Sequence, residues 1–182
     1  VVGLMARNIA NGNNFPFYFW GQHHMGAFEA YCVAFFYKAT GPSVFWLKLV
    51  PALFWYLSIP IMYLLWRQVS DRQVALPAAL LTIFPGYFLS EWISNARGGY
   101  SEIVFLGALV LYLYSTHEQH RNKRLLLFLV WLLSSIAFWI NAQSISFIIP
   151  IAVHYVLSEK YDLKAYFIRV LHIFSGFSPM LI

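Results

Sequence analysis

The stretch from Phe45 to Trp66 reads FWLKLVPALFWYLSIPIMYLLW, and it decides the fold class. It matches the roughly 20 predominantly apolar residues that an α-helix needs to cross a bilayer. Its single charged residue, Lys48, lies near one end, where a long side chain can reach the interface. Pro51 and Pro60 fall inside the stretch, and membrane helices tolerate proline. We therefore predict a membrane-spanning helix here.

Further apolar stretches follow, each bounded by a polar turn. They predict spans at 74–89 (kinked at Pro85-Gly86), 100–116, 125–140, 145–157 and from 166 onward. Hydrophobic residues make up 60% of the chain, charged residues only 10%, and the mean hydropathy is +0.63. Soluble domains carry about 25% charged residues. The predicted fold class is all-α, a polytopic transmembrane helix bundle with about six spans over residues 44–182.

Residues 1–43 are expected to form an outer loop with interfacial helices. Residues 1–10 can form a short helix, which the Asn- and Gly-rich turn at 11–14 ends. The aromatic band at 15–20 suits the headgroup level of a membrane. Apolar residues at helical spacing predict a second helix over 24–40, too short to span and expected to lie in the interface.

The basic residues at span ends fall on alternate turns, at 67–72, 117–124 and 158–164. By the positive-inside rule these turns face the cytoplasm, which places the turn around Arg97 outside. The cytoplasmic turns account for most of the net charge of +5. No basic stripe remains for nucleic acid. We expect an integral protein of the bacterial plasma membrane whose site faces outward.

The residues at the two ends of the chain lead to a further expectation about its length. The chain begins at Val1 rather than Met and ends at Ile182 within an apolar run. We therefore expect it to be part of a longer polytopic protein, with the last span incomplete. The single Cys32 excludes an internal disulfide and has no metal-binding spacing.

Arg97 lies where topology does not require a cation. It is flanked by Glu91 and Glu102 and followed by Gly98-Gly99. An arginine offers a planar fork of donors that suits a phosphate, and glycine amides can approach an anion closely. The alternative is a salt bridge that ties the turn together. We favour a functional anion site, because ionisable groups near membrane depth are costly.

A second candidate segment precedes the interfacial helix and reads GQHHMGAFE, ending at Glu29. Its polar side chains could contact a substrate, or they could form a polar interfacial turn; the sequence favours neither. Two adjacent histidines without a further ligand are weak evidence for a metal. Glu29 either points to water, the simpler interpretation, or turns into a polar cavity.

For several other polar residues, a structural role is a simpler interpretation than a functional one. His154 and His172 lie singly in apolar helices and are expected to be packed or hydrogen-bonded. His117 and His120 belong to a solvated charged turn. Asn141 and Gln143 lie in an outer turn, where capping of a helix is favoured over a place in the outer cavity. The expected outer site is formed by the polar residues of the other two outer segments.

The motifs GQHHMGAFE (21–29), GPS (41–43) and ARGGYSE (96–102) together resemble membrane glycosyltransferases of the GT-C superfamily. The chain is most similar to the group of protein O-mannosyltransferases and aminoarabinose transferases, over nearly its whole length. The resemblance implies transfer of a sugar from a polyprenyl-phosphate donor to a lipid, glycan or protein acceptor outside the cytoplasm, with inversion at the anomeric carbon. It places the family's catalytic Asp just before Val1.

Leaving-group chemistry assigns roles to the candidate residues. A departing lipid phosphate needs positive charge, and the acceptor hydroxyl needs a base. Arg97 is the candidate for the first role. The candidate catalytic carboxylates are Glu102 and Glu29. The candidate substrate-binding residues are Gln22, His23, His24, Glu91, Asn95, Arg97 and Tyr100.

The sequence leaves open whether the site needs a metal ion and whether the protein is an enzyme. Glu29, Glu91 or Glu102 could orient Arg97 or ligate a divalent ion, so a metal requirement is left unassigned. A membrane transporter or a non-catalytic membrane subunit is the alternative function. A transporter favours polar residues in the middle of the membrane, whereas here they lie at the outer ends of the spans.

Overall fold

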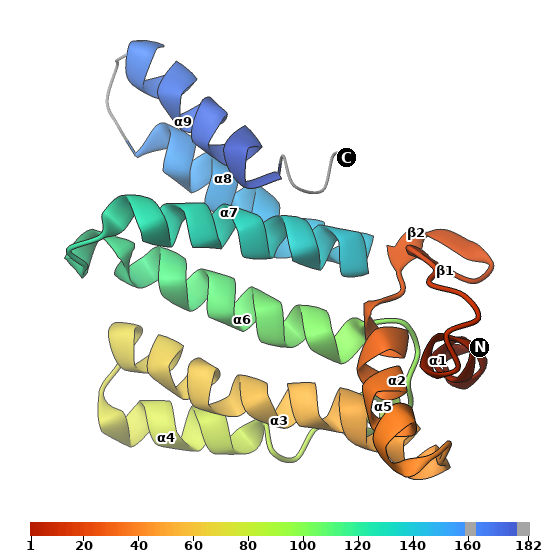
Figure 1. The fold of residues 1–182 in the computed structure, drawn as a ribbon. Helices are drawn as coiled ribbons and strands as arrows, with labels where there is room; N and C mark the ends of the chain where they lie inside the picture. Colours follow the sequence, from red (N-terminus) through yellow and green to blue (C-terminus); the bar gives the residue numbers. More distant parts are fainter. Residues whose placement is uncertain (159–162, 178–182) are drawn as a thin grey trace.

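The computed structural model describes residues 1–158 and 163–177, and it is mostly helical, as predicted. Long helices lie side by side, and the N-terminal segments cross one end of them (Figure 1). The long helices are α3 (Val44–Val69), α6 (Tyr100–Thr116) and α7 (Lys123–Ile140). In the described residues, α3 and α7 are the two helices long and apolar enough to cross a membrane.

The N-terminal segments form a small unit with its own core. Helix α1 (Val2–Ala10) packs on α2 (Phe28–Thr40), and the two share buried residues such as Met5 and Val33. Helix α1 confirms the predicted short helix. The predicted helix at 24–40 starts late, because residues Gln22–Gly26 form strand β2, antiparallel to β1 (Tyr18–Phe19). The backbone of this strand pairs with β1 and bridges to Asn141, which takes it out of the helical conformation.

The predicted span at 74–89 is wrong in its extent. Helix α4 covers only Arg72–Leu81, and after a break the short helix α5 covers Tyr87–Ile93. Proline disfavours the helical conformation in the residue before it, and Pro85 is followed by Gly86, which precedes α5. The chain therefore leaves the helical conformation before the Pro-Gly pair, where only a kink in a continuous helix was expected.

The C-terminal half follows the sequence prediction closely. Helix α7 and helix α8 (Ile145–Leu157) form the expected hairpin, joined by short 3₁₀ helix η2 (Ala142–Ser144). Helix α9 (Leu163–Phe177) packs on α7. A second 3₁₀ helix, η1 (His117–Gln119), follows α6. Most of the predicted turn at 158–164 and the side chain of His172 lie outside what the structure describes.

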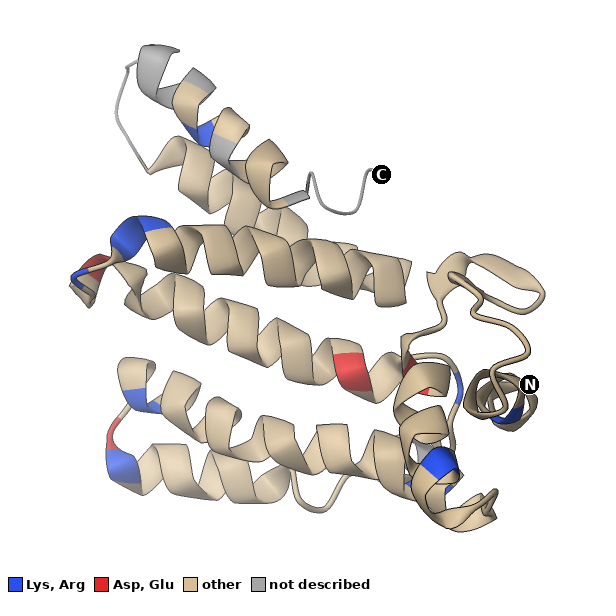
Figure 2. Ribbon diagram, in the orientation of Figure 1, with Lys and Arg blue, Asp and Glu red and all other residues tan. Residues whose placement is uncertain are grey.

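Charge is distributed unequally along the long helices. The basic turns at 67–72 and 117–124 gather at the end away from α1 and α2 (Figure 2). Glu29, Glu91 and Glu102 belong to segments at the opposite end, where α2, α5 and the start of α6 meet. This end holds the candidate site.

Candidate functional site

Glu29 lies in the first turn of α2, and its side chain is buried, with 2% of the residue exposed. Its Oε2 accepts a hydrogen bond from the backbone N–H of Gly98 at 2.5 Å. The simpler expectation, a carboxylate pointing to water, is therefore wrong. Burial raises the pKa of Glu29 to about 7, while the backbone amides of Gly98, Gly99 and Arg97 lower it in part.

Two glycines shape the backbone that receives this carboxylate. Gly98 and Gly99 have φ of 98° and 90°, in the left-handed region that side chains disfavour. A Cβ on Gly98 would overlap Met25, and one on Gly99 would overlap Ile140. Successive amides in such a conformation make an anion-binding concavity. The sequence suggested that these amides would meet a substrate anion, whereas in the structure they meet Glu29.

Glu102 lies in the first turn of α6 and has 0% of its surface exposed. Neither of its carboxylate oxygens has a hydrogen-bond partner among the described residues. Its charge interacts with that of Glu29. The Cys32 thiol lies near both carboxyl groups, and burial, Glu102 and Glu29 together raise its pKa to about 12. Two buried carboxyl groups so placed are disfavoured as a pair of anions.

Arg97 pairs with Glu91 rather than with the buried carboxyl groups. Its Nη2 lies 2.7 Å from Oε1 of Glu91, and the side chains are 39% and 49% exposed. The guanidinium carbon stands 5.4 Å from the ring centroid of Trp92. Asn95 donates from Nδ2 to the carbonyl oxygen of Glu91 at 2.9 Å. The salt bridge expected of a merely structural turn is thus present, and the arginine side chain stays partly exposed.

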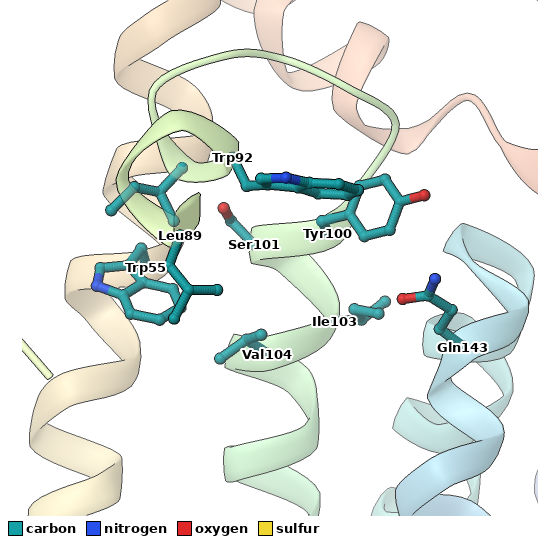
Figure 3. A pocket seen from close by; sticks show the side chains of 9 residues that line it. Trp55, Leu89, Trp92, Tyr100, Ser101, Ile103, Val104 and Gln143 are labelled. Carbon is teal, nitrogen blue, oxygen red and sulfur yellow. The ribbon is translucent and has the colours of Figure 1, made fainter. Parts of the chain in front are cut away.

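Trp92 also lines a mainly apolar pocket of about 300 Å³ (Figure 3). Trp92 and Tyr100 meet edge to face in its wall, with ring centroids 4.5 Å apart. The buried Ser101 hydroxyl has no described hydrogen-bond partner, and it is directed toward Leu89 and Trp92. The other lining residues are Trp55, Ile93, Ile103, Val104 and Gln143.

The structure brings together only part of the predicted site. Glu29 and Glu102 approach each other beneath the Arg97 turn, as the sequence suggested for the two outer segments. The other three predicted residues of the first segment lie on β2 with exposed side chains: Gln22, His23 and His24. Among the described residues, no three His, Cys, Asp or Glu side chains are arranged to hold a metal ion.

The capping interpretation is confirmed for Asn141, since its side chain accepts from the amide of Gln143 at 3.0 Å. Gln143 instead lines the pocket. His154 is hydrogen-bonded as expected, with Nδ1 2.6 Å from the Tyr114 hydroxyl. His117 was expected in solvent, but it is buried and bonds the carbonyl oxygen of Tyr114. The 3₁₀ turn after α6 folds it back onto that helix.

The pocket residues Ser101 and Trp92 were missed as site residues. Both lie in or near the motif at 96–102, but Trp92 contacts the ring of Tyr100 from the separate short helix α5, which the sequence did not predict. No protein family, curated protein or solved structure matches this chain in comparisons of sequence and fold. The resemblance to GT-C glycosyltransferases therefore rests on the motifs alone and stays a prediction.

Proposed function

We propose that this chain is part of a polytopic membrane enzyme that transfers a sugar from a polyprenyl-phosphate donor to an acceptor outside the cytoplasm, with inversion. The supporting observation is the placement of Arg97 over the ring of Trp92, a residue that lines an apolar pocket. An exposed cation beside an apolar cavity suits an amphiphile with a phosphate head. A soluble anion has no apolar part that could pack against the aromatic residues lining the pocket.

Membrane insertion is supported by length and by charge. Helices α3 and α7 can each cross a bilayer. Helices α6, α8 and α9 lie alongside them, although each is shorter than a full span (Figure 1). Basic turns at one end would face the cytoplasm by the positive-inside rule, in a bacterial plasma membrane. The end with α1 and α2 would then face outward.

In the proposed reaction, an acceptor oxygen attacks the anomeric carbon while the bond to the phosphate oxygen breaks. Negative charge grows on the departing lipid phosphate, and Arg97 would stabilise it with its fork of N–H donors. Glu91 holds the guanidinium in place at 2.7 Å. Glu29 and Glu102 are closed off from solvent in this structure. The base that takes the proton of the acceptor hydroxyl would therefore be the catalytic Asp that the resemblance to GT-C enzymes implies.

The alternative is a transporter or a non-catalytic membrane subunit. A transporter would place its polar groups midway along broken helices. Ser134 and Ser135 are the buried hydroxyls of α7, and both bond backbone carbonyl oxygens. Their hydrogen-bonding capacity is used within the protein. Among the described residues, the unpartnered carboxyl and hydroxyl oxygens of the candidate site instead lie at the start of α6, while the unpartnered groups on α7 are the uncharged indole N–H groups of Trp131 and Trp139.

The test is donor consumption by the purified full-length protein in lipid nanodiscs, with a membrane lipid extract as the acceptor source. We expect release of polyprenyl phosphate from at least one polyprenyl-phosphate-linked hexose in a panel. The same sugar on a nucleoside diphosphate should not be consumed. Absence of release across the panel, or consumption of the nucleotide donor, would remove the proposed function. Movement of intact donor between leaflets without cleavage would favour the transporter.

A further inference from the structure

The amides of the Arg97 turn are held by a carboxylate that comes from a distant part of the chain. Glu29 on α2 contacts the turn before α6 through the amide of Gly98. The amides of Arg97 and Gly99 add to the stabilisation of its charge. Gly99 caps the N-terminus of α6, whose own dipole also favours an anion. Glu29 thus fills an anion site that the fold builds for it.

We propose that Glu29 is a positioning residue, which fixes the turn at residues 97–99 and thereby aims the Arg97 side chain at a substrate phosphate. This inference rests on the function proposed above. The carboxylate contacts the backbone at and beside Arg97, whereas Glu91 and Trp92 contact the guanidinium. Backbone and side chain of the arginine are therefore held by separate partners.

Stability alone does not require a carboxylate at this position. Burying a carboxyl group carries a desolvation cost, and a second buried carboxyl group, Glu102, adds repulsion. The turn has other attachments, because the Ala96 amide donates to the carbonyl oxygen of Leu47 at 3.1 Å. A neutral side chain would hold helix α2 in place at lower cost. Above the pKa of about 7, where Glu29 is ionised, its charge strengthens the hydrogen bonds from the amides next to Arg97.

The same geometry explains why both positions after Arg97 are glycine. Their positive φ values turn the backbone amides toward the carboxylate of Glu29. Because they lack side chains, Met25 and Ile140 can pack against the turn. The turn is thereby enclosed by β2, α2 and α7. A guanidinium attached to so confined a backbone is preorganised, which is the property that charge stabilisation in catalysis requires.

The experiment compares Glu29→Gln with the matched variant Glu118→Gln in the purified full-length protein in nanodiscs at pH 8, where the Glu29 carboxyl group is ionised. Glu118 is an exposed glutamate at the opposite end, paired with Lys123. For Glu29→Gln we expect faster amide hydrogen exchange at residues 97–99. We also expect about a 10-fold rise in KM for the polyprenyl-phosphate donor, as for loss of one charged hydrogen bond. Glu118→Gln should change neither quantity.

A double-mutant cycle with Arg97→Ala separates positioning from general loss of structure. If Glu29 acts through Arg97, then Glu29→Gln should cause little further loss of transfer in the Arg97→Ala background. Fully additive losses, or unchanged exchange at residues 97–99, would overturn the proposal. If the wild-type protein consumes no donor, the proposed function fails. The exchange measurement then still decides separately whether Glu29 holds the turn.

Discussion

Replacing Glu29 by glutamine should reduce the fall of stability with rising pH between about pH 5 and pH 8. The group lies on α2, outside the helices proposed to span the membrane. Burial raises its pKa from 4.5 to about 7, against the partial opposing effect of the backbone amides. Between those values the folded protein keeps a proton that the unfolded chain has released. The free energy of unfolding therefore falls as the pH rises through this window.

The size of the effect follows from the two pKa values. Each pKa unit corresponds to about 1.4 kcal/mol, so the rise from 4.5 to about 7 amounts to about 3 kcal/mol. For a chain of this size, a change of 1 kcal/mol shifts the melting temperature by roughly 2–4 °C. The titration of Glu29 alone should thus lower the melting temperature by roughly 6–12 °C between pH 5 and pH 8, so the fall in Glu29→Gln should be smaller than the wild-type fall by about that amount. Glutamine has nearly the same shape and does not titrate.

The assay is thermal unfolding in detergent micelles or nanodiscs at closely spaced pH values. Glu118→Gln is the control, because the hydrogen bond from Lys123 lowers the pKa of Glu118, and its pH dependence has the opposite sign. That variant should keep the wild-type fall. If Glu29→Gln showed the same fall as the wild type, the carboxyl group would not titrate as its burial requires, and the account of this contact would be refuted.

Three further outcomes are expected. Gly99→Ala should destabilise the protein by more than the ~1 kcal/mol cost of a left-handed alanine, because its Cβ has no room; a melting temperature equal to the wild type would contradict this. Ser101→Ala should leave the melting temperature unchanged or raise it, since the hydroxyl has no described partner, and a clear drop would reveal one. Single cysteines at Gln119 and Ser94, in a Cys32→Ser background, should react with an impermeant thiol reagent from opposite sides of the membrane. Labelling of both from one side would refute the proposed topology.

The long helices could be predicted because their signal is local. Apolar runs of sufficient length, interrupted by polar turns, gave α3, α6, α7 and α8 nearly residue by residue. The hairpin of β1 and β2 could not be predicted, because its polar strand lacks alternation and is held by pairing with another segment. The extent of α4 was wrong, since the sequence marks Pro85 without showing whether the chain kinks or leaves the helix there.

The candidate site was predictable only in part. The motifs identified the two segments that meet, but not which groups on them would touch. Glu29 and Gly98 are 69 positions apart, and a carboxylate in an amphipathic helix points to water as readily as inward. The sequence therefore predicted a substrate anion as the partner of the Gly98 and Gly99 amides, whereas in the structure that partner is Glu29. The exposure of His23 and His24 likewise depends on the hairpin, which the sequence does not signal.

The most direct test of the central claim is the rate of sugar transfer by Arg97→Lys, with Arg121→Lys, in the basic turn at the opposite end, as its matched control. Lysine keeps the charge but loses the two-pronged donor geometry. Loss of one preorganised donor costs ~3–4 kcal/mol of barrier, so transfer should fall roughly 100- to 1000-fold, with the melting temperature almost unchanged. If the ion pair with Glu91 is only structural, it contributes about 0–1 kcal/mol of stability. Near-normal turnover in both Arg97→Lys and Arg97→Ala would contradict the phosphate role.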